Sequence, residues 1–538
     1  MAVAVGLTAA RAGSNLVAPS SYDRWLVPPA ALAIHLCIGM AYGFSVFWLP
    51  LSRALGGAAP RTCDATVSIP AELFTTACDW RISTMGWMYT LFFVFLGSSA
   101  ALFGGWLERA GPRRAGLVSA ACWCGGLCIS ALGVRLHQLW LLWLGSGVIG
   151  GIGLGLGYIS PVSTLIKWFP DRRGMATGMA IMGFGGGALV GAPLADRLMK
   201  RFATPGSPGV AETFLALAAI YFVFMVGGAL GYRVPPPGWR PAGPTVRAGS
   251  TNSGSRHVPA SRVFGIRQFW LLWLVLLLNV SAGIGIVGMA SPLLQEVFGG
   301  RLIGIDAPLA RLDAAGQKAT ASAGAAFTGL LSLFNIAGRF AWASLSDRIG
   351  RRTTYAIFFL LGGALYASIP SLARAGSLPL FVAACCLILT MYGGGFATIP
   401  AYLADLFGTQ MVGAIHGRLL TAWSTAGILG PVLVNYIREY QLARGTGSAE
   451  AYNVTMYLLG GLLAVGFVVN LLVRPVEDRH FTTAAPPGPL AAAAIPVGIE
   501  AGPVRRNPAL LCAAWIAVCA PLGWGVFVTL QKAAGLLR

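Results

Sequence analysis

The sequence has little charge. Only 10% of its 538 residues are charged, against about 25% in a typical soluble domain, and 56% are hydrophobic. A single soluble core is therefore excluded, and the long apolar runs indicate a protein that crosses a membrane many times. The net charge of +20 does not indicate a nucleic-acid partner, because Lys and Arg lie in short loops and form no continuous basic stripe.

Acidic residues are missing from the interior of the apolar segments. Asp196, Glu296 and Asp405 all fall at segment ends. A cation or multidrug exporter is expected to carry a buried carboxylate, so this class is disfavoured. The segments also contain no nucleophile with an acid–base partner and no metal-ligand cluster. We therefore expect no enzyme activity, no cofactor and no metal site.

The ten cysteines show no metal-ligand spacing, and most lie in apolar segments where they are typical packing residues. Cys63 and Cys78 differ, because both lie in one polar loop after the first segment. If this loop faces an oxidising compartment, a disulfide between them would close it. Two free thiols are the alternative interpretation.

Apolar segments long enough to cross a bilayer predict twelve transmembrane helices and one extra C-terminal helix. A stretch rich in Pro, Gly and Ser and a second rich in Ala and Pro indicate linkers. The expected parts are an N-terminal arm (1–25), a six-helix half (26–234), a linker (235–267), a second six-helix half (268–474), an Ala/Pro-rich linker (475–508) and the extra helix (509–530).

The loops predict the orientation. Lys and Arg favour the N-terminal arm and the loops on its side of the membrane, although the loop near 197–201 runs against this bias. Positively charged loops face the cytoplasm, so we expect the N-terminus and the 235–267 linker there. The extra helix would then place the C-terminus in the periplasm.

The two halves are related by an internal repeat. Residues 155–193 align without gaps with residues 393–431; both stretches begin with a Gly-rich run, and the first ends in Gly-Ala-Pro and the second in Leu-Gly-Pro. The charged loop at 107–113 likewise matches 346–352. Two copies of one unit predict a substrate site near the middle of the membrane, at their interface.

These motifs resemble a known family. The loops LERAGPRR and SDRIGRR resemble the signature loop of the major facilitator superfamily. Within it, AYGFSVFWLPL, GLGYISPVSTLIKWFPDRRGMATG and NIAGRFAWASLSDRIGRR are similar to the oxalate:formate antiporter family, which is related to the monocarboxylate transporters. The resemblance implies an all-α membrane protein of the major facilitator fold. It implies a monomeric rocker-switch carrier of small carboxylate anions in a bacterial inner membrane. The extra helix resembles a one-helix subunit found beside or fused to such carriers.

Arg339 is the main candidate for the substrate site. It is the only charge between residues 323 and 346, and it lies about 12 Å along the helix from Asp347. A central membrane arginine costs about 2.5–3.5 kcal/mol to insert, so it normally faces a partner or a polar cavity. In the related carriers this arginine binds the substrate carboxylate, and Asn335, one turn earlier, is expected to donate to the substrate. A buried arginine satisfied by backbone carbonyls is the alternative.

Aromatic residues are expected to shape the site. Tyr158, Tyr392 and Tyr42 would supply hydroxyl groups, although each is also explained as a packing residue. Oxalate-specific members of the family carry a second basic residue near Trp423, which is absent here. Because one buried cation balances one carboxylate, this favours a monocarboxylate such as formate or lactate.

Ion coupling is left open by the sequence. Without an intramembrane carboxylate, exchange of one anion for another is favoured over proton-coupled symport. His35 and His416 are candidate proton carriers, and both are also explained as core histidines.

The charged loops are expected to latch one conformation and to release in the other. The candidate gating residues are Glu108, Arg109, Arg113, Asp347, Arg348 and Arg352. A transporter-like sensor is a weaker alternative, because the loop at 235–262 is short and without features of a signalling domain.

Overall fold

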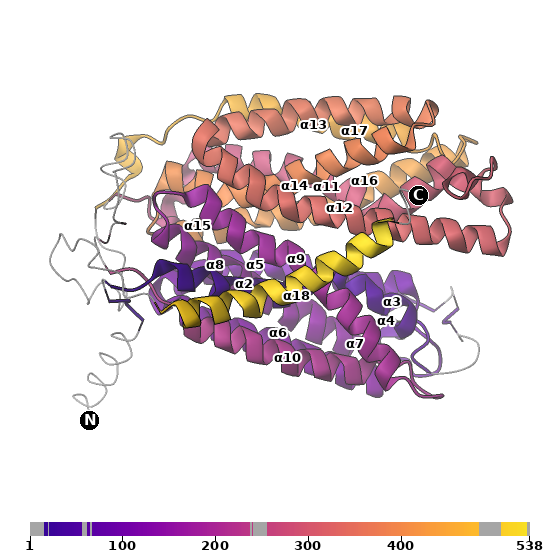
Figure 1. Cartoon of the computed structure of the whole chain (residues 1–538), viewed down its shortest axis with the longest axis horizontal. Helices are drawn as coiled ribbons and strands as arrows, with labels where there is room; N and C mark the ends of the chain where they lie inside the picture. The colour runs from indigo at the N-terminus through magenta and orange to yellow at the C-terminus, as the bar shows by residue number, and fades with distance from the viewer. Residues whose placement is uncertain are drawn as a thin grey trace.

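A computed structural model describes residues 16–19, 21–55, 62–64, 67–236, 239, 241, 256–483 and 507–534. Within these ranges the chain forms helices and loops with only isolated bridges, which confirms the all-α prediction. Figure 1 shows the long helices packed side by side. Residues 1–15 of the predicted N-terminal arm, most of the 235–267 linker and residues 484–506 of the Ala/Pro-rich linker lie outside the described residues.

The helices of the first half follow the predicted segments closely. The first is irregular and the fourth contains a π-helical turn within a glycine-rich stretch. Their bounds are η1 (Arg24–Leu26), α2 (Val27–Ile38), η2 (Gly39–Phe47), α3 (Trp48–Leu51), α4 (Ile69–Phe74), α5 (Ile82–Ala110), α6 (Pro112–Arg135), α7 (Leu139–Leu142), η3 (Trp143–Gly150), α8 (Gly151–Trp168), α9 (Arg173–Phe202) and α10 (Val210–Gly231).

The second half repeats this pattern and is followed by one more long helix. Its bounds are η4 (Ala260–Gly265), α11 (Arg267–Phe298), η5 (Gly299–Ile303), η6 (Leu309–Arg311), α12 (Ala314–Ile349), α13 (Arg351–Arg374), α14 (Leu378–Phe407), α15 (Val412–Leu419), α16 (Thr421–Ala443), α17 (Asn453–Leu471), η7 (Asp478–His480) and α18 (Pro508–Ala534).

Twelve helices of the described chain are long and apolar enough to cross a membrane, and the last of these spans is Pro508–Gln531 in α18. The predicted segment 413–437 is not among them. The structure divides it into α15 and α16, which meet at Leu420 against Gly97 of α5. α15 is short, and the last turns of α16 carry Arg438 and Glu439.

The charged loops turn at repeat-related glycines. Gly111 joins α5 to α6 and Gly350 joins α12 to α13, each with φ of +88°. A side chain is rarely accommodated at this φ, so the turn requires glycine at both positions. The same sharp turn therefore brings Glu108 and Asp347 to one end of the bundle, which we call the latch end.

The contact between the two halves is called the seam. It is formed chiefly by α5 against α15 and by α9 against α12. Backbones approach so closely that a Cβ at Gly417 would lie 2.1 Å from the carbonyl oxygen of Ala100, and one at Gly174 would lie 2.0 Å from that of Ala343. Small residues permit this approach, as is typical of membrane helices.

The opposite end, called the cap end, carries a folded loop between α3 and α5. The structure joins Cys63 and Cys78 in a disulfide. Glu72, in α4 of this loop, is fully buried and accepts hydrogen bonds from the backbone N–H (2.7 Å) and the Nε (2.7 Å) of Arg81. Nε2 of His137 lies 2.8 Å from the carbonyl oxygen of Cys78. The loop is therefore anchored to the bundle on both sides.

Candidate functional site

Arg339 lies on α12 and reaches across the seam. Its side chain is fully buried. Nη1 donates to the carbonyl oxygen of Ile181 on α9 (3.1 Å), and Nε donates to Oδ1 of Asn335 (3.1 Å). Nη2 has no hydrogen-bond partner among the described residues. One guanidinium thus contacts both halves and keeps one of its two terminal nitrogens open.

The charge of Arg339 is not balanced by an acidic side chain in the described part of the chain. The ion pairs found there involve other cations, mainly at the two ends of the bundle. A buried charged group that lacks a partner is strongly unfavourable, and an unmade hydrogen bond adds about 1–3 kcal/mol. The hydrogen bond to the backbone carbonyl of Ile181 offsets part of this cost. This contact agrees with the alternative interpretation, in which backbone carbonyls satisfy a buried arginine. The open nitrogen fits a bound anion.

Aromatic rings from both halves surround the guanidinium. Its Cζ lies 5.9 Å from the ring of Tyr42, 5.8 Å from that of Phe184 and 5.5 Å from that of Phe396. The ring centroid of Trp423 lies 4.7 Å from that of Phe396 and 5.3 Å from that of Tyr158. We call these five aromatic residues the cage. Ring faces attract a cation without neutralising it, so the cage stabilises the guanidinium but leaves its charge unbalanced.

Several polar atoms of this region are buried without a partner. The hydroxyl of Tyr158, the indole N–H of Trp423 and both ring nitrogens of His416 make no hydrogen bond within the described chain. Each buried unpaired group costs about 1–3 kcal/mol. Tyr158 and Trp423 belong to the cage, and the His416 ring packs against that of Tyr158, so these unpaired groups lie next to the rings around Arg339.

The two candidate proton carriers differ in their surroundings. Nδ1 of His35 lies 2.5 Å from the carbonyl oxygen of Ala180, and Nε2 lies 3.1 Å from that of Tyr158. A neutral imidazole donates from only one nitrogen, so both contacts are satisfied at once only by the protonated ring. The His416 ring packs 5.9 Å from that of Tyr158 instead.

The other predicted site residues differ in how they contact Arg339 and the cage. Asn335 uses its carbonyl oxygen to hold Arg339, so its observed contact positions the arginine. Tyr392 is buried and touches the cage through Phe396, at 5.3 Å between ring centroids. Arg339, Asn335, Tyr42, Tyr158 and Trp423 are therefore brought together, and Tyr392 joins them through Phe396 and Tyr42.

Three contributors were not identified from the sequence. Phe396 occupies the repeat position of Tyr158, since residues 155 and 393 correspond, and that pairing was a usable signal. Phe184 is the only bulky residue between Gly183 and Gly187. The carbonyl of Ile181 has no signal in the sequence, because backbone acceptors carry no residue identity.

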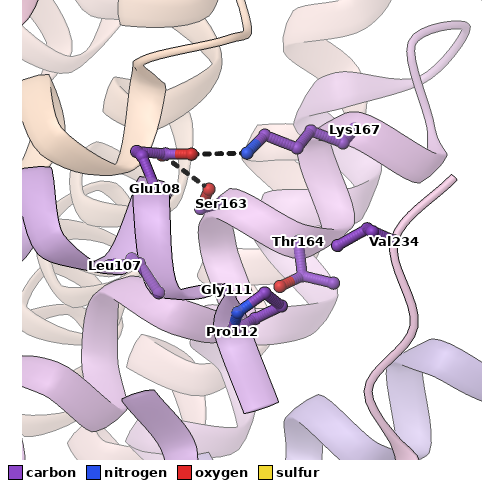
Figure 2. A pocket seen from close by; sticks show the side chains of 8 residues that line it. All are labelled: Leu107, Glu108, Gly111, Pro112, Ser163, Thr164, Lys167 and Val234. Atoms are coloured by element: carbon purple, nitrogen blue, oxygen red, sulfur yellow. Dashed lines mark hydrogen bonds and ion pairs between the residues drawn. The ribbon is translucent and has the colours of Figure 1, made fainter. Parts of the chain in front are cut away.

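Glu108 joins the halves at the latch end. Its Oε1 accepts hydrogen bonds from Ser163 (2.9 Å) and from the backbone N–H of Gly413 in α15 (2.9 Å), and Oε2 pairs with Lys167 (2.5 Å). Figure 2 shows Glu108, Ser163 and Lys167 turned toward one another beside a small pocket. The first N–H groups of a helix attract negative charge, so this carboxylate is well suited to hold α15.

Asp347 makes the reciprocal contact. Its carboxylate accepts hydrogen bonds from the backbone N–H groups of Gly174 (2.8 Å) and Met175 (2.9 Å) at the start of α9. Asp405 adds a second link across the seam through Arg173 (2.8 Å). Met175 and Gly413 are repeat-related positions. Each half thus presents a carboxylate to a helix N-terminus of the other.

The described hydrogen bonds of the remaining gating candidates stay within one half. Arg109 and Arg348 are exposed. Arg113 donates to the carbonyl oxygen of Tyr232 (3.2 Å) within its own half, and Arg352 donates to that of Leu471 within the other. The ion pair of Arg173 with Asp405 crosses the seam instead, whereas Lys167 pairs with Glu108 inside the first half.

Comparison with known proteins places the chain in a family. The model described as "Major Facilitator Superfamily" matches residues 30–431 and 315–536. The oxalate:formate antiporter of Oxalobacter formigenes is 26% identical over 390 residues, covering 72% of this chain and 83% of its own. The apicoplast pyruvate carrier 1 of Toxoplasma gondii is 26% identical over 381 residues, covering 63% of this chain and 66% of its own.

The fold agrees with this family match. The solved structure of the proton:xylose symporter XylE aligns with a TM-score of 0.57 at 14% identity, covering 84% of this chain and 95% of the other. The family match spans more than half of the sequence, and the predicted major facilitator fold is confirmed by this likeness and by the twelve candidate spans. The chain belongs to the Major Facilitator Superfamily.

Proposed function

We propose that the protein is a secondary transporter of small monocarboxylates that works by alternating access and binds the substrate carboxylate at Arg339. The observation that carries the proposal is a fully buried arginine at the seam, with an open Nη2 and no acidic partner in the described chain. Two relatives, an oxalate:formate antiporter and a pyruvate carrier, support a carboxylate substrate.

The surroundings of Arg339 favour one carboxylate over two. Trp423 lies near the position at which oxalate-specific members of the resembled family carry a second basic residue, and its ring packs against Phe396 and Tyr158. A second carboxylate would have to be buried without a counter-charge, at a cost of several kcal/mol. Neutral donors such as the hydroxyl of Tyr158 suit a second oxygen atom of a monocarboxylate. Formate and lactate are the substrates that we expect.

The unbalanced charge of Arg339 also favours the exchange of one anion for another. When the site closes without a substrate, the guanidinium is buried beside a carbonyl oxygen, an amide oxygen and aromatic rings, with no acidic side chain among its described contacts. When an anion is present the charge is neutralised, so closure is favoured in the loaded carrier. We therefore propose antiport as the principal mode.

Proton-coupled symport is the second candidate. It is supported by His35, which lies between two backbone carbonyl oxygens and satisfies both only when protonated. Its ring packs 5.4 Å from that of Tyr158, so its charge would be felt at the cage. A proton on His35 would then accompany the anion.

The direction of opening follows from the loops. Since positively charged loops face the cytoplasm, we propose that the latch end is cytoplasmic and that the disulfide-bearing cap end faces the periplasm of a bacterial inner membrane. The N-terminus would then be cytoplasmic, and α18 would carry the C-terminus to the periplasm. A monomer suffices for this mechanism, because both halves of the site come from one chain.

The mode of transport is tested with purified protein in liposomes. Vesicles loaded with formate, lactate, pyruvate, glyoxylate or oxalate are diluted into labelled lactate or formate. We expect uptake only when a monocarboxylate is present inside, with little effect of a proton ionophore. Uptake into empty vesicles that requires an inward proton gradient would instead establish symport, and His35→Gln would then abolish it.

The anion site is tested at Arg339. Arg339→Ala removes a charge-assisted hydrogen bond worth about 3 kcal/mol or less, so exchange should fall as much as about 100-fold. Arg339→Lys keeps the charge but loses the planar fork, and we expect a smaller but clear loss. Arg374→Ala, at the end of α13, is the control, because Arg374 is exposed. Unchanged exchange by Arg339→Ala protein would contradict the proposed site.

A further inference from the structure

The last helix lies across the seam on the outside of the bundle. Figure 1 shows α18, in yellow, running obliquely over α2 and α9 and ending beside α12. It contacts all three of these helices. Most of its surface is turned away from the protein, so it is not part of the core of either half. Its position touches the two elements, α9 and α12, that carry Ile181 and Arg339.

Most of the described contacts of α18 are with the first half. Val518 is buried against Leu32 and Ala33 of α2. Leu522 covers Gly186 of α9, where an added Cβ would lie 2.6 Å from its Cδ1. The backbone of α18 approaches α9 closely at one further point, Gly525 against Leu189, and Trp524 lies under the guanidinium of Arg197 at 4.8 Å.

The contact with the second half is made near the end of α18. Thr529 is buried, and its Cγ2 would lie 3.1 Å from a Cβ added at Gly329 of α12. Gly329 is about 15 Å along α12 from Arg339, on the side of the cap end. α18 therefore contacts the first half over several turns, and it also contacts the second half at Gly329, near the middle of α12.

We propose that α18 is a conformational brace that moves with the first half and packs against α12 only while the latch end is closed. In a membrane, helices associate through close packing and not through the hydrophobic effect, so the contact at Gly329 adds stability only to states in which it fits. α18 thereby biases the carrier toward the state that is closed at the latch end. The inference rests on alternating access, but not on the identity of the substrate.

Two engineered cysteine pairs test the brace without any substrate. Gly329→Cys with Thr529→Cys joins α18 to the second half, and Gly186→Cys with Leu522→Cys joins it to the first. Both pairs are placed in full-length protein carrying Cys512→Ser and Cys519→Ser, since those native thiols are exposed on α18. Oxidative cross-linking in membranes is then scored on gels, with and without Glu108→Gln, which weakens the latch.

We expect both pairs to cross-link, and Glu108→Gln to lower the yield of the 329/529 pair by about threefold or more while leaving the 186/522 pair unchanged. Equal yields with and without Glu108→Gln would overturn the brace, as would a fall in both pairs or failure of either pair to react. Because the yields require no transport, a wrong substrate assignment would leave this result untouched. Exchange assays on the same proteins should show that cross-linking of 329/529 stops turnover reversibly, whereas 186/522 does not.

Discussion

At the scale of single residues, the main feature of the site is that Arg339 has no acidic partner among the described residues. It carries a full charge in a buried position, and its described contacts are one amide oxygen, one carbonyl oxygen and aromatic rings. The importance of Arg339 could be predicted from the sequence, because a lone charge in a long apolar segment is rare and costly. Its contact with both halves could not be predicted, because its hydrogen-bond partner in the first half is the backbone carbonyl of Ile181, which does not depend on residue type.

The number of cations in the cage should decide the number of carboxylates in the substrate. Trp423→Lys places an ammonium group among the cage rings, so oxalate exchange should appear while lactate and formate exchange fall about tenfold or more. Counterflow with labelled oxalate measures the gain. Trp423→Leu, which changes size without adding charge, is the matched control. If both variants handle oxalate equally, charge at this position does not set specificity.

The cage also shows where residue-level prediction was limited. Tyr158 and Trp423 were identified through the family resemblance, whereas Phe184 and Phe396 were not, although both rings lie within 6 Å of the Arg339 guanidinium carbon. Phenylalanine carries no polar atom, so its presence in an apolar segment is uninformative by itself. Only the internal repeat, which pairs Phe396 with Tyr158, distinguished it from packing residues.

At the scale of secondary-structure elements, the latch is built from carboxylates and helix N-termini. Glu108 binds the start of α15 and Asp347 binds the start of α9. The charged loops could be recognised from the sequence, but the choice of partners could not. Carboxylates bind N–H groups at helix starts, and the three-dimensional arrangement of the halves decides which helix starts are available.

Neutralising the latch should open that end of the carrier. Glu108→Gln and Asp347→Asn keep the size of the side chain but remove a charge-assisted bond, worth about 1–2 kcal/mol more than a neutral one. A cysteine at Val412, now 1% exposed at the start of α15, should then react about five- to thirtyfold faster with maleimide. Arg348→Gln, on an exposed side chain of the same loop, should leave labelling unchanged. Equal rates in all variants would contradict the latch.

The cap end is tested through its cysteines. The pairing of Cys63 with Cys78 in the structure predicts that neither thiol reacts with maleimide in membranes prepared without reductant, and that both react after reduction. Gly206→Cys, at an exposed position of the cap-end loop between α9 and α10, serves as the internal positive control. Peptide mass spectrometry assigns the labelled sites. Labelling of Cys63 and Cys78 before reduction would show that the loop is held by other contacts, such as those of Glu72 and His137.

At the scale of the whole molecule, the sequence was most informative. Long apolar segments, a repeat and two charged turns predicted the helical architecture, because the bilayer and the glycine turns impose strong local rules. The break between α15 and α16 was not predicted, since it contains no proline and arises where Leu420 packs against Gly97 of α5. The course of α18 was equally inaccessible, because a lipid-facing helix carries little pattern to say what it rests on.

The glycines of the seam have a consequence for how this protein tolerates mutation. Replacing Gly174 or Gly417 by alanine adds a single methyl group, yet that group would enter the backbone of the opposite half. Neither half would be damaged internally, so such variants should be synthesised, inserted and as heat-resistant as the parent while turning over slowly or not at all. Screens that score only protein abundance would classify these variants as harmless. Only a measurement of transport rate would reveal that the two halves no longer move past one another at the seam.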